Sequence, residues 1–202
     1  MARLAVFASG RGTNFMAIAA GLMAVHRHGI EFLLCDVDGA PVLERARELK
    51  IPVFPISYTG LPREAVEKKI VRHLERRQVD LVALAGFMRI LSPYFIDAFK
   101  GPIINLHPSL LPKYPGIHGI AESYASPDKE LGITVMRIDQ GVDTGPVLLQ
   151  KSFTRTGTES LEEMEKRIHA LEHEWFPRTL IGLLDEIDGM RAGGKAAGRS
   201  HP

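Results

Sequence analysis

Residues 4–24, LAVFASGRGTNFMAIAAGLMA, decide the fold of this chain. The apolar run over residues 4–8 has the length of a buried strand, and residues 14–24 follow a helical pattern for which Thr13 is a possible cap. The glycine-containing turn SGRGTN connects the two segments. A strand, a tight turn and a helix in this order form the first unit of an alternating α/β domain.

The same alternation continues through the next hundred residues. Apolar runs predict strands over residues 31–37, 53–56, 80–85 and 103–106, and periodic segments predict helices over 42–49, 63–77 and 93–99. After Asp80, every residue of the run over 80–85 is apolar, which is typical of a strand buried on both faces of a sheet. The pattern therefore predicts an α/β fold: a doubly wound, mostly parallel sheet with helices on both faces.

The second half of the chain departs from this alternation. Residues 132–139 and 145–153 predict two strands joined by a short loop, and residues 160–185 predict a final helix. Because no linker or internal repeat appears, residues 1–190 are expected to form a single domain. Residues 191–202 are rich in Gly, Ala and basic side chains, and they predict a disordered tail.

Charge and cysteine content restrict the class of protein. The 25 basic side chains nearly balance the 24 acidic ones, so the composition predicts no nucleic-acid surface. No apolar run approaches the ~18 residues of a membrane span, and the N-terminus does not resemble a secretory signal. The single Cys35 cannot form an intramolecular disulfide, which favours a reducing compartment. We expect a cytoplasmic protein without a membrane partner.

The segment NLHPSLLP, residues 105–112, contains the most informative side chains. Asn105 and His107 are two residues apart at the end of a predicted strand, so both point to the same face. The following prolines disfavour a helical conformation at His107 and Leu111 and stiffen the exit from the strand. An amide beside an imidazole can stabilise negative charge on an oxygen atom while a proton moves.

Two other segments also follow predicted strands, where sites of parallel sheets lie. Residues 9–14 could bind phosphate at a helix N-terminus, or they could be an ordinary glycine turn. They match neither the dinucleotide fingerprint nor the P-loop. Residues 86–91, GFMRIL, could line a pocket for a flat ring, or they could be core residues with a surface Arg89.

Two further motifs each allow two interpretations. Asp143, in the loop GVDTG, could orient a protonated His107, or it could stabilise a local turn. His169 and His173 are one helical turn apart, but the motif lacks a clear third metal ligand. No metal is therefore expected.

Four strings, taken in order, resemble the folate-dependent formyltransferases. They are SGRGTN at residues 9–14, AGFMRILS at 85–92, NLHPSLLPKYPG at 105–116 and DTGP at 143–146. The resemblance covers nearly the whole chain and implies a Rossmann-like fold. It also implies transfer of a formyl group from the cosubstrate 10-formyltetrahydrofolate to the amine of glycinamide ribonucleotide, through a tetrahedral intermediate.

The resemblance assigns a role to each matching residue. It implies that Asn105, His107 and Asp143 are catalytic, that Gly12, Thr13 and Asn14 hold the substrate phosphate with help from Arg63, and that Glu172 touches the ribose side. It implies a folate pocket formed by Met88, Arg89, Ile90, Leu91, Ile138, Asp139, Gln140, Gly141 and Val142. Arg89 would meet the glutamate carboxylate of the folate.

One residue leaves the identity of the acceptor substrate undecided. Met136 lies where the purine enzymes of this family often have a second histidine, so methionyl-tRNA and an amino-sugar nucleotide are alternative acceptors. A non-catalytic folate-binding relative is a further alternative. The resemblance also suggests a cis Leu111–Pro112 bond. We expect a monomer or a homodimer that binds small molecules.

Overall fold

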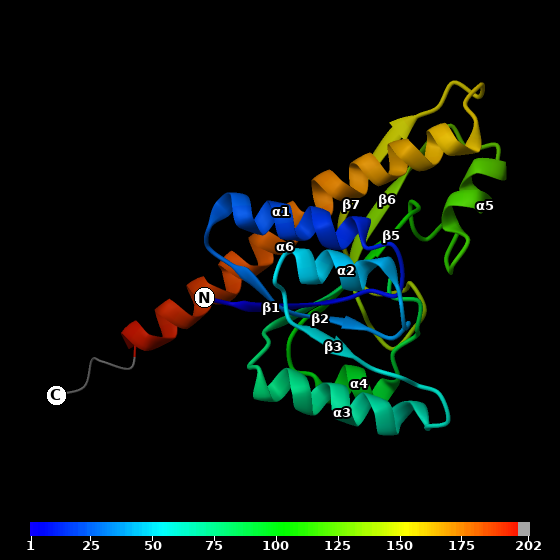
Figure 1. Cartoon of the computed structure of the whole chain (residues 1–202). Coiled ribbons are helices and arrows are strands. Elements are labelled where there is room, and N and C mark those ends of the chain that lie inside the picture. Colours follow the sequence, from blue (N-terminus) through cyan, green and yellow to red (C-terminus); the bar gives the residue numbers. More distant parts are fainter. Residues whose placement is uncertain (198–202) are drawn as a thin grey trace.

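A single seven-stranded sheet lies between two layers of helices (Figure 1). The computed structural model describes the backbone of residues 1–197 and the side chains of residues 1–193. The strands are β1 (Arg3–Phe7), β2 (Gly29–Cys35), β3 (Val53–Pro55), β4 (Leu81–Leu84), β5 (Ile103–His107), β6 (Glu130–Arg137) and β7 (Val147–Thr154). Their order is β3-β2-β1-β4-β5-β6-β7; β1 to β5 are parallel, and β6 and β7 are antiparallel additions at one edge.

The helices divide between the two faces of the sheet. They are α1 (Thr13–Val25), α2 (Pro41–Glu48), α3 (Arg63–Arg76), α4 (Pro93–Ala98), α5 (Gly119–Ala125) and α6 (Leu161–Ala197). Helices α1, α2 and α6 cover one face, and α3 and α4 cover the other (Figure 1). Burial on both faces explains why all four residues of β4 are apolar.

The predicted doubly wound α/β fold is confirmed, with local differences. Thr13 is the first residue of α1 rather than its cap, because Gly12 takes the cap position with a φ of 73°. Helix α5 was not predicted, since seven residues between loops carry little periodic signal.

The prediction of a tail from residue 191 is wrong for residues 191–197, which continue α6. Arg, Lys and Ala in this stretch are good helix formers that can extend an existing helix, although Gly193 and Gly194 are poor ones. The rest of the predicted tail lies outside the described residues.

The topology brings the predicted site segments to one edge of the sheet. Strand β1 lies next to β4, and β4 lies next to β5, so the loops after all three emerge together. The Ser9 amide donates to the Gly86 carbonyl at 3.0 Å, which joins two of these loops.

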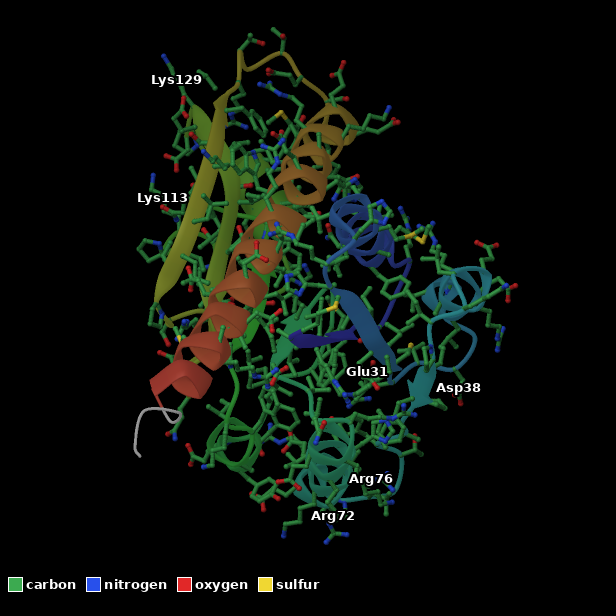
Figure 2. The ribbon with its side chains drawn as sticks, turned by 90° about the vertical axis from the view of Figure 1, so that its left-hand side faces the viewer. Glu31, Asp38, Arg72, Arg76, Lys113 and Lys129 are labelled. Carbon is green, nitrogen blue, oxygen red and sulfur yellow. The ribbon has the colours of Figure 1, made fainter. Side chains whose placement is uncertain are left out.

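The basic side chains labelled in Figure 2 are spread over the molecule. Lys113 and Lys129 lie near β6 and β7, and Arg72 and Arg76 lie on α3.

Candidate active site

A cleft at the carboxyl edge of the sheet collects most of the predicted site residues. Its walls come from the loop after β4, the end of β5, the loop after β5 and the loop between β6 and β7. Lining residues that were predicted from the sequence are Met88, Arg89, Ile90, Leu91, Asn105, His107, Ile138, Asp139, Gly141, Val142 and Asp143. Residues from four separate segments thus face one space.

Asn105 and His107 lie on the last part of β5, and both line the cleft. The Asn105 side chain makes no hydrogen bond to any residue that the structure describes, so its amide can serve a bound molecule. His107 is buried, with its side chain only 4% exposed. The pair forms one polar strip at the base of the cleft.

The two ring nitrogens of His107 have different partners. Nε2 lies 2.8 Å from the Tyr114 carbonyl oxygen, and Nδ1 lies 3.5 Å from Oδ2 of Asp143. Because a carbonyl oxygen can only accept, Nε2 carries a hydrogen and donates it. Nδ1 is therefore the ring nitrogen that faces the Asp143 carboxylate.

Asp143 is held in place by the backbone. Its Oδ2 accepts a hydrogen bond of 2.8 Å from the Gly116 amide, and its own backbone has a φ of 54°. The local turn is instead made by Asp139, whose Oδ1 accepts from the Gly141 amide at 2.9 Å and from Thr144 Oγ1 at 2.8 Å. Asp143 is thus available to His107, and the turn interpretation applies to Asp139.

Thr134 supports the segment that follows His107. Its hydroxyl donates to the Ser109 carbonyl at 2.7 Å and accepts from the Leu111 amide at 3.0 Å. The Leu111–Pro112 bond is cis, as predicted. Met136 lies opposite Asn105 on β6, is buried, and is not a lining residue of the cleft.

The loop after β4 forms an apolar wall of the cleft. Met88 is 64% exposed and Ile90 is 62% exposed, so for these two residues the interpretation as ordinary core is wrong. Leu91 lies below them and is buried. Exposed large apolar side chains that line a cleft are typical of a binding surface for an apolar ligand.

Arg89 is held from two sides. Its Nε forms an ion pair with Oδ2 of Asp36, and its guanidinium lies 4.1 Å from the centre of the Tyr58 ring. Burial is the main cause that raises the pKa of Tyr58 to about 12, so the ring remains a neutral phenol. This geometry is consistent with a cation–π contact at the end of the apolar wall.

Two predicted residues lie away from their expected neighbours. Gln140 is exposed, does not line the cleft, and donates from Nε2 to Oδ1 of Asp97 at 3.2 Å. Arg63, expected near the phosphate loop, donates from Nη1 to the Ile90 carbonyl at 3.5 Å. Since α3 begins at Arg63 on the face opposite to α1, its side chain reaches the apolar wall.

The glycine loop after β1 forms a second polar region. Gly12, Thr13 and Asn14 start α1, where free backbone N–H groups and the helix dipole favour an anion. Asn14 Nδ2 donates to Glu172 Oε2 at 3.0 Å, although the two residues are 158 positions apart. His169 Nδ1 contacts the same carboxylate oxygen at 2.8 Å, and this hydrogen bond is the main cause that raises the His169 pKa.

The chain also matches a family of known proteins. The family model described as "Formyl transferase" matches residues 2–180. This chain belongs to the formyl transferase family.

The formyltransferase is similar to purine enzymes from several organisms. It is 43% identical to a Bacillus subtilis protein named phosphoribosylglycinamide formyltransferase, over 91% of this chain and 95% of that protein. It is 37% identical to a trifunctional purine biosynthetic protein of Drosophila melanogaster, over 91% of this chain but only 14% of that longer protein. The crystal structure of glycinamide ribonucleotide transformylase 1 from Geobacillus kaustophilus matches with a TM-score of 0.85 and 44% identity, covering 91% of this chain and 99% of the other.

Some residues of the formyltransferase site were not predicted. Asp36, Tyr58, Tyr114 and Ile117 were missed, as was the contact of His169 with Glu172. Asp36 follows β2 at the carboxyl edge, but the predicted strand of residues 31–37 included it, so its position after the strand was not recognised. The Tyr114 carbonyl carries no side-chain signal at all.

Within residues 1–197 of the formyltransferase, the structure has no helix that could cross a bilayer. Over the same part of the chain, no three His, Cys, Asp or Glu side chains gather as metal ligands. Cys35 is buried.

Proposed function

We propose that this formyltransferase transfers the formyl group of 10-formyltetrahydrofolate to the amine of glycinamide ribonucleotide, the third step of purine biosynthesis. The observation that carries the proposal is the convergence of Asn105, His107 and Asp143 on one cleft with an apolar wall. The anion-binding start of α1 lies at the same edge of the sheet. The proposed donor site, acceptor site and proton-handling groups would thus be adjacent.

The apolar part of the cleft suits the donor. Met88, Ile90 and Val142 expose apolar surface that a flat folate ring would cover, and burial of such surface contributes about 25 cal/mol per Å². Arg89 at the end of this wall supplies a cation for the glutamate carboxylates. We assign Arg63 to the same group, because its guanidinium contacts Ile90 rather than the glycine loop.

The start of α1 suits the acceptor. The backbone N–H groups of Thr13 and Asn14 are available for the phosphate, since the first turn of a helix has no internal partners for them. Glu172 is buried beside Asn14 and can accept hydrogen bonds from ribose hydroxyls. These contacts would direct the amine of the acceptor toward the cleft.

The catalytic residues then have separate tasks. When the amine attacks the formyl carbon, negative charge develops on the formyl oxygen, and the Asn105 amide and a protonated His107 can stabilise that charge. The Asp143 carboxylate lies 3.5 Å from Nδ1 and can hold the ring in this orientation during the reaction. The proton released by the amine must reach the departing folate nitrogen, and the His107–Asp143 pair can move it.

Met136 does not favour another acceptor. It is buried between β5 and β7 and does not line the cleft, so its replacement of a histidine changes the core rather than the binding surface. We propose small-molecule substrates only, without nucleic acid or membrane partners, in a cytoplasmic monomer or homodimer.

An acceptor comparison tests the proposed function. Purified protein with 10-formyltetrahydrofolate is given glycinamide ribonucleotide, an amino-sugar nucleotide or methionyl-tRNA, and formyl transfer is measured. We expect activity with glycinamide ribonucleotide alone. Higher kcat/KM with either other acceptor would contradict the assignment, and folate binding without any transfer would indicate a non-catalytic relative.

A further inference from the structure

Asp36 lies where the donor wall (the apolar wall, residues 86–91) and the acceptor loop (the glycine loop, residues 9–14) meet. It directly follows β2, and its side chain is only 3% exposed. Burial of a carboxylate costs free energy unless the charge is paired and hydrogen-bonded. Both oxygens of Asp36 are satisfied, and by residues of two different segments.

One oxygen holds the arginine of the donor wall. Oδ2 of Asp36 pairs with Nε of Arg89, while Tyr58 packs against the guanidinium plane. An arginine has five N–H donors, so this contact at Nε leaves four on the two terminal nitrogens. Asp36 and Tyr58 therefore fix the plane of Arg89 and leave its terminal donors for a carboxylate.

The other oxygen holds the acceptor loop. Oδ1 of Asp36 accepts from Ser9 Oγ at 2.6 Å, and Ser9 Oγ in turn accepts from the Met88 amide at 3.1 Å. Ser9 begins the loop that leads into α1, whereas Met88 belongs to the donor wall. The Ser9 hydroxyl therefore connects both segments to the same buried carboxylate.

We propose that Asp36 is a positioning residue that sets the geometry of both substrate sites through Arg89 and Ser9. The inference rests on the proposed function, because it takes Arg89 as the contact for the glutamate of the folate. Asp36 is not a lining residue of the cleft and has no direct role in formyl transfer. Its effect is expected on substrate affinity rather than on turnover.

Two substitutions separate the two contacts. Asp36→Asn keeps a polar side chain of the same shape that can still hydrogen-bond Ser9, but it removes the charge that holds Arg89. Asp36→Ala removes both contacts. Asp38→Asn is the matched control, because Asp38 is an exposed acidic residue in the same loop and the change of charge is identical.

The first readout is direct binding of two folates that differ only in the glutamate. Calorimetry gives the dissociation constants of tetrahydrofolate and tetrahydropteroate for each variant. Asp36→Asn should weaken tetrahydrofolate binding about tenfold, the size expected from about 1.4 kcal/mol of a charged hydrogen bond, and leave tetrahydropteroate binding unchanged. The control variant should bind both folates as the parent protein does.

The second readout is steady-state kinetics. The acceptor KM should rise about tenfold in Asp36→Ala and by less than twofold in Asp36→Asn, with kcat of both variants within about twofold of the parent. If Asp36→Ala does not fold, the binding result of Asp36→Asn decides whether Asp36 is a positioning residue.

The outcomes are distinguishable from failure of the proposed function. A parent protein that prefers the glutamate-bearing folate, with the same preference in Asp36→Asn, would overturn the inference alone. A parent protein that does not distinguish the two folates would contradict the role of Arg89 in donor binding. The acceptor KM of Asp36→Ala would then decide the inference, and an unchanged value would overturn it.

Discussion

At the scale of single residues, the chemistry depends on how His107 is held. One ring nitrogen donates to the Tyr114 carbonyl, and the other faces Asp143. The imidazole ring cannot flip by rotation about its side-chain bond without losing both contacts. In the proposed mechanism, proton exchange of His107 therefore takes place at the ring nitrogen that faces Asp143.

Loss of either partner should abolish most of the turnover. We predict that His107→Ala and Asp143→Ala each lower kcat about 10²–10³-fold while the fold remains intact, because a preorganised donor and its charge partner are removed. Activity assays measure kcat, and circular dichroism measures whether the fold remains intact. His118→Ala is the control, since His118 is an exposed loop histidine. Near-normal kcat in either variant would exclude that residue from the mechanism.

His169 should make stability depend on pH. The hydrogen bond with Glu172 is the main cause that raises the His169 pKa, so folding favours its protonated form. The extra stability is complete below the unfolded pKa of about 6.5 and is lost as pH rises through the folded value. We predict that His169→Gln loses stability relative to the parent at about pH 6 and matches it at about pH 9, by a small amount because the ring is 44% exposed.

Urea unfolding at several pH values measures this difference. His173→Gln is a control of opposite sign, because burial is the main cause that lowers the His173 pKa. Protonation of His173 opposes folding, so the parent should lose stability relative to His173→Gln as pH falls. The same pH trend in both variants would contradict the opposite directions assigned to the two histidine pKa shifts.

At the scale of elements, a buried carboxylate joins α3 to α4. Glu67 is fully buried, and it accepts from the Ser92 amide at 2.9 Å and from the Ser92 hydroxyl. Ser92 caps α4 and directly follows the apolar wall of the cleft. The contact therefore anchors the end of that wall.

Removal of this carboxylate should lower stability. We predict that Glu67→Ala reduces the free energy of unfolding by about 1–3 kcal/mol, because the buried Ser92 donors lose their partner. Glu75→Ala, an exposed change in the same helix, should stay within about 0.5 kcal/mol. Guanidinium unfolding measures both. Equal effects would show that Glu67 contributes no more than a surface residue.

The connection between β1 and α1 requires a glycine at position 12. Gly12 has a φ of 73°, and a Cβ there would lie 2.7 Å from Cβ of Val42 in α2. We predict that Gly12→Ala costs about 1–3 kcal/mol of stability and raises the acceptor KM, because α1 must shift. Gly10→Ala has open space around it and should cost clearly less. Urea unfolding and acceptor titration measure the two effects.

At the scale of the whole molecule, α6 serves both the core and the site. It packs along α1 and buries Phe176, Leu180 and Leu184, and it also carries Glu172 to the acceptor loop. One helix late in the chain thus contributes to the proposed acceptor site, which begins at residue 9. Packing of α6 and affinity for the acceptor are therefore linked.

A substitution that creates a cavity under α6 should show that packing of α6 and affinity for the acceptor are linked. We predict that Phe176→Ala lowers the free energy of unfolding by about 3–5 kcal/mol and raises the acceptor KM, because the lost ring contacts let α6 shift. Met190→Ala, an exposed change on the same helix, is the control. Chemical unfolding and kinetics measure the effects. A destabilised Phe176→Ala with an unchanged acceptor KM would separate packing from the site.

The sequence by itself determined the alternating elements, because hydrophobic periodicity and turn residues act over a few neighbouring positions. It placed Asn105 and His107 on one face for the same reason. The family resemblance indicated Glu172 as a candidate site residue. Residues 191–197 were misjudged because a packed helix can extend beyond its periodic signal.

Only the tertiary structure decided which distant residues meet. The strand order brought Asp143 to His107, and the packing of α6 on α1 brought Glu172 to Asn14. It also brought Arg63 to the apolar wall and placed Asp36 between that wall and the glycine loop. No local pattern contains these contacts, because they depend on the order of strands in the sheet and on which face each helix covers.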